Sequence, residues 1–182
     1  MDITQIIGQI FGMIAVLLGF VSYQAKNDKQ LMLAQAVTGA VFAIHYFLLG
    51  ATPGAVLNIV CIIRNLVYYH KDKRFYKPKL FPILFAVIML IFGIYSANGI
   101  HSVLVIAGQV ISTVCFSFKS AQNVRKSVLV TCPMVLIYDV IEHSVGGVSY
   151  ESVAMVSAII GIVRYRKTTS EVSGDFESLK EK

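Results

Sequence analysis

The side chains best suited to chemistry in this sequence stand inside apolar runs. Arg64 interrupts a run of isoleucine, valine and cysteine, with Asn58 before it and Asn65 directly after it. Polar and charged groups are costly to bury among apolar residues, so each needs a partner or a function. Amides and carboxyls in such places bind polar solutes or protons, or they hydrogen-bond neighbouring helices. The candidate substrate-binding residues are His45, Asn58, Arg64, Asn65, Asp139 and Glu151.

Each candidate has a structural interpretation as well as a functional one. Arg64 lies about 9 Å of helical rise from the end of its apolar run, so its side chain reaches the membrane interface as an anchor, or contacts a solute, a carboxylate or a lipid phosphate. His45 titrates near neutral pH, which allows a proton-linked role, but it also suits a hydrogen bond between helices. Asp139 and Glu151 bind either water and neighbouring side chains or solute and protons. The residue types leave these alternatives open.

The residue pattern argues against enzymatic and metal chemistry. The sequence shows no nucleophile–base pair, no phosphate-binding loop and no metal-ligand spacing, and it implies no cofactor. Cys61, Cys115 and Cys132 fall in apolar runs without a CxxC spacing, which is typical of buried thiols that pack as small apolar groups. We therefore predict a protein that is not an enzyme.

Composition places the chain in a membrane. It has 182 residues, of which 56% are hydrophobic and 14% are charged, and its mean hydropathy is +0.71. Soluble domains carry about 25% charged residues, so this chain lacks the polar surface that water requires. The net charge of +6 does not indicate nucleic-acid binding, because the basic residues stand between apolar runs rather than on one face of a soluble fold.

The apolar runs predict an all-α membrane protein with seven transmembrane helices. A bilayer core needs about 20 mostly apolar helical residues. The start MDITQ lacks a basic region, so the first helix is expected to be retained rather than cleaved as a signal peptide. The predicted spans are Ile3–Tyr23, Leu31–Leu49, Pro53–Tyr69, Leu80–Ala97, Ile100–Phe118, Val124–Ile141 and Val148–Tyr165.

Lysine and arginine alternate between the connections of these spans. The first, third and fifth connections and the C-terminal tail hold every basic residue except Arg64, including Lys26, the cluster within 71–79 and Lys119. The N-terminus and the second, fourth and sixth connections hold none. The positive-inside rule therefore predicts an N-terminus outside and a C-terminus in the cytoplasm.

A shift of the chain by 93 positions suggests an internal repeat, because it aligns loop lysines, glycines and polar residues of the two halves. The shift predicts a 3+1+3 parallel repeat, the arrangement of sugar facilitators of the SWEET type, with polar residues facing each other across a pseudo-two-fold axis. Its parts are three helices in 1–78, a linker helix in 79–98, three helices in 99–167 and a disordered cytoplasmic tail in 168–182. The aligned pairs include Lys26 with Lys119, Gly54 with Gly147, Asn58 with Glu151, and His45-Tyr46 with Tyr138-Asp139.

Three stretches, GMIAVLLGF, HYFLLGATPG with the following IIR, and GGVSYE, resemble bacterial inner membrane proteins of the YgjV type. The resemblance runs through most of the chain and is most specific from His45 to Arg64. It implies a bacterial inner-membrane location and a transporter-like fold, since that family is grouped by fold with the SWEET, PQ-loop and PnuC vitamin transporters. The chain departs from that group, because Ser22-Tyr23-Gln24 and Ser117-Phe118-Lys119 lack the proline of a Pro-Gln pair, and Pro133 alone lies in a helix interior.

The function expected from these observations is a small-solute transporter or facilitator with a polar site between two three-helix halves. This interpretation requires a hydrated polar cavity between the halves. The alternative is a non-transporting membrane sensor or assembly partner, whose helices would pack shut with their polar groups paired. The expected partners are the lipid bilayer, a small polar solute of unknown identity, and a second copy in a homodimer if the GxxxG of Gly8 and Gly12 serves dimerisation rather than internal packing.

Overall fold

The structure is a computed structural model that describes residues 2–23, 28–70, 77, 80–116 and 121–180. These residues form seven helices and no strand, so the predicted all-α class is confirmed. Each predicted span overlaps one helix. The helices are α1 (Ile3–Tyr23), α2 (Asp28–Leu49), α3 (Thr52–Tyr69), α4 (Leu80–Ser96), α5 (Ser102–Phe116), α6 (Ala121–Ile141) and α7 (Val145–Lys180).

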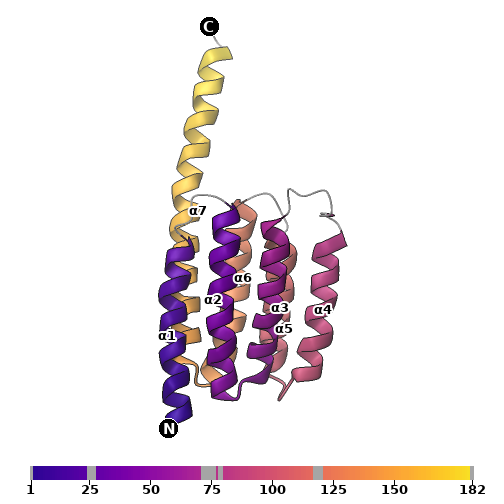
Figure 1. The fold of residues 1–182 in the computed structure, drawn as a ribbon. Coiled ribbons are helices and arrows are strands. Elements are labelled where there is room, and N and C mark those ends of the chain that lie inside the picture. Colours follow the sequence, from indigo (N-terminus) through magenta and orange to yellow (C-terminus); the bar gives the residue numbers. More distant parts are fainter. Residues whose placement is uncertain (1, 24–27, 71–76, 78–79, 117–120, 181–182) are drawn as a thin grey trace.

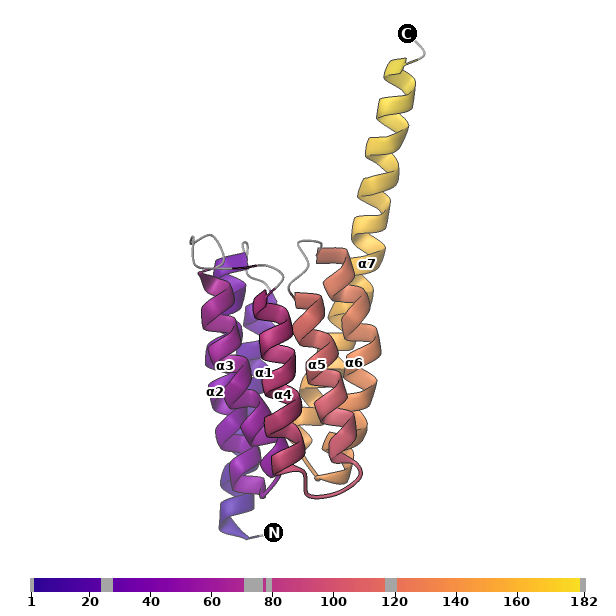
Figure 2. The same cartoon turned by 90° about the vertical axis from the view of Figure 1, so that its right-hand side faces the viewer.

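Six of the helices form two layers of three. In one layer α1 packs on α2 and α2 on α3, and in the other α5 packs on α6 and α6 on α7. The layers meet where α1 contacts α7 and where α3 contacts α5. The remaining helix, α4, contacts α3 and α5 and bridges the layers at one edge, as Figure 2 shows.

The outer surface of the bundle is apolar and several polar side chains are buried inside it, which is the opposite of a soluble protein. Large apolar side chains are exposed on the outer faces of the helices, for example Leu17 at 67% and Phe47 at 76%. His45 and Asp139, by contrast, are 0% exposed inside the bundle. A bilayer favours this pattern, because apolar side chains face the lipid while polar groups find partners inside the protein.

Two of the described helical segments, Ile3–Ser22 and Lys29–Leu49, are long and apolar enough to cross a membrane by themselves, and three shorter apolar helices accompany them. The more polar α3 has 18 residues, which rise about 27 Å, close to the thickness of a hydrocarbon core. Its Arg64 and Asn65 are buried in the bundle, whereas Ile59 and Ile63 are exposed. The outward face of α3 therefore stays apolar.

The helix ends that flank the basic connections lie together. The C-terminal ends of α1, α3 and α5 are at the end of the bundle from which α7 projects, and the N-terminus is at the opposite end (Figure 1). Lys26, the basic residues at 71, 73, 74 and 79, and Lys119 lie outside the described residues. A common end for these connections agrees with the alternating charge, while the membrane side that this end faces stays a prediction.

The turns between α2 and α3 and between α6 and α7 have the same backbone structure. Each contains a residue with positive φ, Gly50 at 78° and His143 at 53°. In both turns the N–H of this residue donates to the carbonyl three residues back, and the next N–H donates to the carbonyl five back, which is a Schellman cap. The four bonds are Gly50 N to Phe47 O (3.1 Å), Ala51 N to Tyr46 O (2.9 Å), His143 N to Val140 O (3.2 Å) and Ser144 N to Asp139 O (2.8 Å).

The last helix departs from the sequence prediction. α7 continues through Lys180, whereas the polar composition of residues 168–182 predicts a disordered tail. The segment contains no proline, and Gly174 is its one glycine, so nothing in it forces the helix to end. The extension projects past the bundle (Figure 1), and residues 181–182 lie outside the described part of the chain.

Candidate functional site

A cavity of about 100 Å³ lies inside the bundle, lined by residues of α2, α3, α5, α6 and α7. A polar space of this size has room for several waters or a small solute. The cavity therefore sits between the two layers, where both contribute side chains. Its polar lining includes Gln35, Tyr46, Asn58, Arg64, Gln109 and Glu151.

Helical spacing brings these side chains to one place. On α2, the lining residues Gln35, Thr38, Phe42 and Tyr46 follow one another at intervals of three or four residues, which places them on one face of the helix. Asn58, Cys61 and Asn65 do the same on α3. These faces of α2 and α3 meet at the cavity. The other faces of the two helices carry no such series of polar side chains.

Four of the six candidate residues line the cavity, namely Asn58, Arg64, Asn65 and Glu151. Asn58 and Glu151, which the 93-residue shift pairs, converge on the same space from α3 and α7. Asn58 donates from Nδ2 to the Gly54 carbonyl at 2.9 Å, and its amide oxygen has acceptor capacity left. Glu151 lines the cavity together with Cys132 of α6. Their role in binding stays a prediction.

Arg64 lies inside the bundle rather than at its lipid-facing surface, with 5% of its surface exposed. Its Nε and Nη2 both donate to Asn65 Oδ1, at 3.1 and 3.0 Å. Its Nη1 donates to Thr113 Oγ1 of α5 at 2.8 Å. The guanidinium is therefore fixed in orientation, joins α3 to α5, and places a positive charge in the wall of the cavity.

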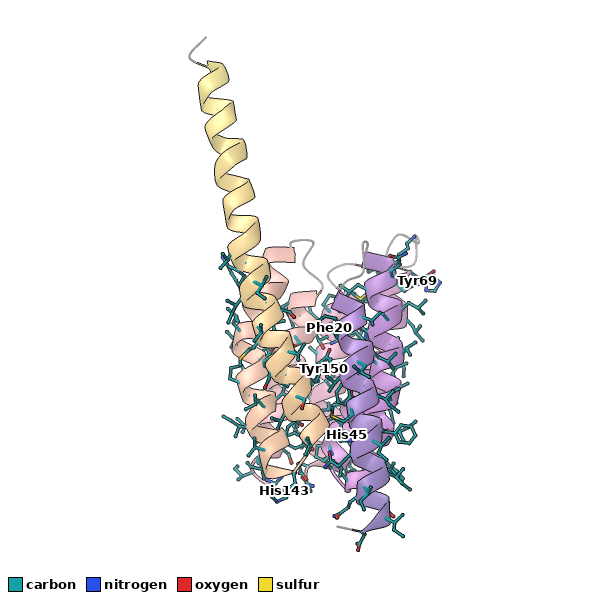
Figure 3. All side chains as sticks on the ribbon, turned by 90° about the vertical axis from the view of Figure 1, so that its left-hand side faces the viewer. Phe20, His45, Tyr69, His143 and Tyr150 are labelled. Atoms are coloured by element: carbon teal, nitrogen blue, oxygen red, sulfur yellow. The ribbon has the colours of Figure 1, made fainter. Side chains whose placement is uncertain are left out.

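His45 lies outside the cavity lining and bridges three segments. Its Nδ1 is 2.7 Å from the Gly8 carbonyl of α1, and its Nε2 is 2.7 Å from Ser144 Oγ before α7. Gly12 leaves room for the imidazole, since a Cβ there would lie 2.7 Å from the ring. Figure 3 shows His45 beside α1. The sequence allowed either a proton-linked role or a hydrogen bond between helices for His45, and the geometry shows the hydrogen bond.

The GxxxG glycines of α1 make contacts within the chain. A Cβ at Gly8 would lie 3.1 Å from Leu48 Cβ of α2, and a Cβ at Gly12 would lie 3.0 Å from Gly146 Cα of α7. These close approaches pack α1 against α2 in its own layer and against α7 in the other layer. The homodimer contact stays an untested expectation.

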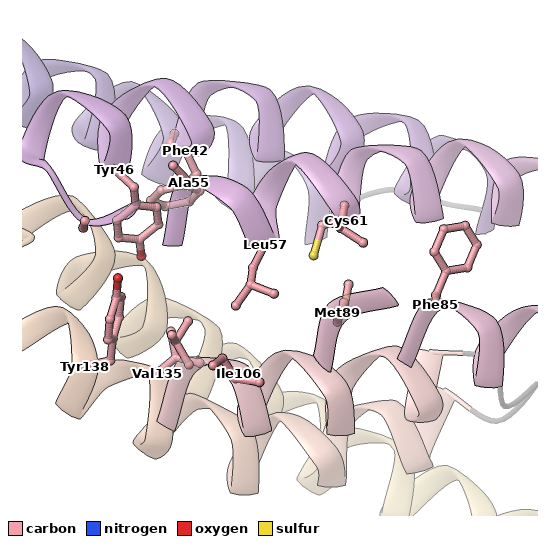
Figure 4. Packing of buried hydrophobic residues seen from close by; sticks show 14 of the residues in the cluster. Phe42, Tyr46, Ala55, Leu57, Cys61, Phe85, Met89, Ile106, Val135 and Tyr138 are labelled. Carbon is pink, nitrogen blue, oxygen red and sulfur yellow. The ribbon is translucent and has the colours of Figure 1, made fainter. Parts of the chain in front are cut away.

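Asp139 also lies outside the lining, but it reaches the cavity through Tyr46. The Tyr46 hydroxyl donates to Asp139 Oδ1 at 2.6 Å, and Tyr46 is one of the residues that line the cavity. Tyr138 accepts a hydrogen bond from the Gly54 N–H at 3.1 Å. In Figure 4 the rings of Tyr46 and Tyr138 point toward each other from opposite layers. The two tyrosines thus link the α2–α3 hairpin to the α6–α7 hairpin.

The sequence analysis missed several lining residues. Gln35 donates to Ser22 Oγ at 2.8 Å and to the Tyr150 hydroxyl at 3.4 Å, so it joins α1, α2 and α7 at the cavity wall. Gln109 accepts a hydrogen bond from Cys61 Sγ at 3.3 Å and also lines the cavity. The available signal was the helical spacing from Gln35 to Tyr46.

Comparison with known proteins identifies one relationship. The family model described as "Bacterial inner membrane protein" and named Imp-YgjV matches residues 6–169. The match contains all the cavity-lining positions. Comparison with curated proteins and with solved structures gave no match.

The described residues contain no group of three or more metal-ligating side chains.

Proposed function

Because the chain belongs to the YgjV-type family of bacterial inner membrane proteins, we propose that it is a transporter or facilitator of a small polar solute. The observation that carries this proposal is the cavity of about 100 Å³ between the layers, lined by amides, a carboxyl and a guanidinium. A protein whose helices only hold one another in the membrane has no need of such a space. The alternative, a sensor or assembly partner that transports nothing, expects polar groups packed against each other.

The proposed architecture is a parallel repeat of two three-helix halves around the linker helix α4. Two features support it. The Schellman caps at Gly50 and His143 are 93 residues apart, as are the hydrogen-bonded side chains Tyr46 and Asp139. The bounds of α2 and α3 also match those of α6 and the first turns of α7 at the same shift.

The cavity lining follows the same shift. Residues 35, 38, 39 and 42 of α2 line it, and so do residues 128, 131, 132 and 135 of α6, each 93 positions later. Asn58 and Glu151 add a further pair from α3 and α7. A site on a pseudo-two-fold axis suits a transporter in which two halves move relative to each other.

The proposed orientation places the N-terminus outside and the C-terminus in the cytoplasm. Its support is the alternating charge of the connections together with the common end at which the basic connections leave the bundle. In this orientation Asn58 and Glu151 lie in the outer half of the membrane and Arg64 lies nearer the cytoplasm. Cysteine labelling in intact cells tests it, and a labelled C-terminal tail would reverse the assignment.

Uptake into proteoliposomes tests the function. The purified protein is reconstituted and offered a panel of radiolabelled sugars, amino acids and small amines, and thermal-shift profiling selects the compounds. Asn58→Ala and Glu151→Gln should each reduce uptake about tenfold or more, because each removes a polar contact in the cavity. Asn98→Ala, which removes an amide outside the cavity, should not. Absence of uptake across the panel, or equal uptake by all variants, would contradict the proposal.

A further inference from the structure

The Asp139 side chain is tightly enclosed by its neighbours. It is 0% exposed, its Oδ1 accepts from the Tyr46 hydroxyl, and its Oδ2 has no hydrogen-bond partner. A Cβ at Gly147 would overlap the carboxyl, so the backbone of α7 covers it closely. Unless a cation enters nearby, an ionised carboxylate in such a place lacks the donors or the charge that would stabilise it.

The titratable groups around Asp139 add negative rather than positive charge. Glu151 approaches from α7, and Glu142 follows the last residue of α6. His101, directly before α5, pairs with Glu142 at 2.9 Å, and His45 of α2 uses both ring nitrogens on Gly8 and Ser144. The remaining groups are weak acids, namely Tyr46, Tyr138 and Cys132. Arg64, the cation of the cavity wall, is bonded to Asn65 and Thr113 and lies about 9 Å of helical rise from Asn58. The two carboxyls therefore have no cation between them, which favours a state in which one proton remains bound.

A hydrogen-bonded hydroxyl connects this proton to the cavity. Tyr46 bonds Asp139 on one side and lines the cavity on the other, where Glu151 lies. Water in the cavity would be in reach of the Tyr46 hydroxyl and of the Glu151 carboxyl. A proton can therefore leave or enter the pair of carboxyls without passing through the apolar outer part of the bundle.

The part of the cavity next to Glu151 is rich in aromatic rings. Phe42, Tyr46 and Tyr150 all line it. Phe42 lies 4.9 Å from Tyr150 and 5.8 Å from Tyr46 between ring centroids. Aromatic faces beside a carboxylate stabilise an organic ammonium group through cation–π and ionic contacts. Glu151 lines the same cavity, where its carboxylate oxygens can accept hydrogen bonds from a ligand.

We propose that Asp139, Tyr46 and Glu151 together hold one exchangeable proton, and that the ammonium group of a small solute binds beside Glu151 in exchange for it. Before exchange, the two carboxyls share one proton and carry one negative charge. Afterwards both are ionised, the ammonium supplies one positive charge, and the proton has passed to water in the cavity. The net charge of the site is unchanged and no covalent bond to carbon forms or breaks. The inference rests on the proposed function in that the solute must enter the cavity.

Proton release on ligand binding tests the exchange. The full-length protein in lipid nanodiscs, weakly buffered at neutral pH, is titrated with methylammonium chloride, with sodium chloride as the ionic control. We expect methylammonium binding by calorimetry and release of about one proton per bound ammonium, detected with a pH indicator. Binding without proton release, or no binding of methylammonium, would overturn the proposal.

Matched variants distinguish the contribution of Glu151 to ligand binding from the contribution of Asp139 to proton release. Glu151→Gln should abolish methylammonium binding, whereas Asp139→Asn should retain it and lose the proton release. Glu142→Gln removes a neighbouring carboxyl that does not line the cavity, and it should behave as the parent protein. If Asp139→Asn does not fold, infrared spectra of the parent protein decide: a protonated carboxyl band must be present and must disappear when methylammonium is added. A spectrum without that band would overturn the proposal.

Failure of the exchange and failure of transport are distinguishable. If proteoliposomes take up a neutral solute while methylammonium neither binds nor releases a proton, the exchange is wrong and the transporter stands. If methylammonium binds with proton release but no solute of the panel crosses the membrane, the site is as proposed and the transporter is wrong.

Discussion

The hairpin of α2 and α3 and the hairpin of α6 and α7 have the same turn but different chemistry. Their Schellman caps place Gly50 and His143 in the same left-handed conformation. At the position four residues before that cap, one hairpin has Tyr46 and the other has Asp139, and the two side chains bond each other. The backbone is thus repeated while the polar side chains are complementary.

The difference extends to charge. The second hairpin brings Glu151 to the cavity where the first brings the neutral Asn58. The first hairpin brings Arg64, and the position 93 residues later holds Ser157. Arg64 is about 9 Å of helical rise from Asn58. One half therefore supplies the cation and the other the acids, so a repeated backbone carries an asymmetric site.

Substitutions of Gly147 beside Asp139 and of Gly54 beside Tyr46 should have the largest effect on stability. Gly147→Ala should destabilise the protein by about 3 kcal/mol, because the new Cβ overlaps the buried Asp139 carboxyl, which cannot move. Gly54→Ala meets the Tyr46 ring at 2.8 Å and should cost about 1–2 kcal/mol, since the ring can turn away. Thermal unfolding in detergent measures both. Gly39→Ala is the control, because its neighbours begin at 3.4 Å. Equal costs at positions 147 and 54 would show that the two hairpins pack alike.

The bond between the hairpins gives the next effect. Tyr46→Phe and Asp139→Asn are combined in a double-mutant cycle, with unfolding measured for both single variants and the pair. We expect a coupling free energy of about 1–2 kcal/mol, because the hydroxyl and the carboxyl are buried and bond each other. Additive effects would show that the two side chains contribute independently to stability.

Arg64 distinguishes the first half from the second. Arg64→Lys should cost about 1 kcal/mol of stability and most of the solute uptake, because an ammonium cannot make the fork to Asn65 and the bond to Thr113 together. Thermal unfolding and proteoliposome uptake measure the two quantities. Lys126→Arg, an exposed change of the same kind, is the control. Unimpaired uptake by the Lys variant would remove Arg64 from the site.

Substitutions at the two Schellman caps should have the smallest effect on stability. His143→Gly should stabilise the protein by about 0.5–1 kcal/mol, because glycine adopts positive φ without a Cβ penalty. The reverse change, Gly50→His, should destabilise it by a similar amount. Thermal unfolding of the two variants measures the difference. A destabilised His143→Gly variant would mean that the imidazole makes a contribution of its own at this turn.

The sequence by itself determined the helices and their class. The first span, Ile3–Tyr23, is predicted with the bounds that the structure has, because its apolar run is long enough to cross a bilayer core. Pro53 marked the start of α3, which the structure begins at Thr52. The polar tail is predicted to be disordered, whereas α7 extends through Lys180, since polarity shows that a segment has no core to join but not that its backbone leaves the helix.

Only the tertiary structure decided which polar side chains share a cavity. His45 and Tyr46 are neighbours in sequence, yet His45 turns to α1 while Tyr46 reaches the cavity and Asp139. Successive residues of a helix point about 100° apart, so the rotation of each helix against its neighbours sets their partners. That rotation depends on packing across both layers, including the close approach of Gly12 to Gly146. Spacing along one helix shows which of its residues share a face, but not which residues of the other helices that face meets.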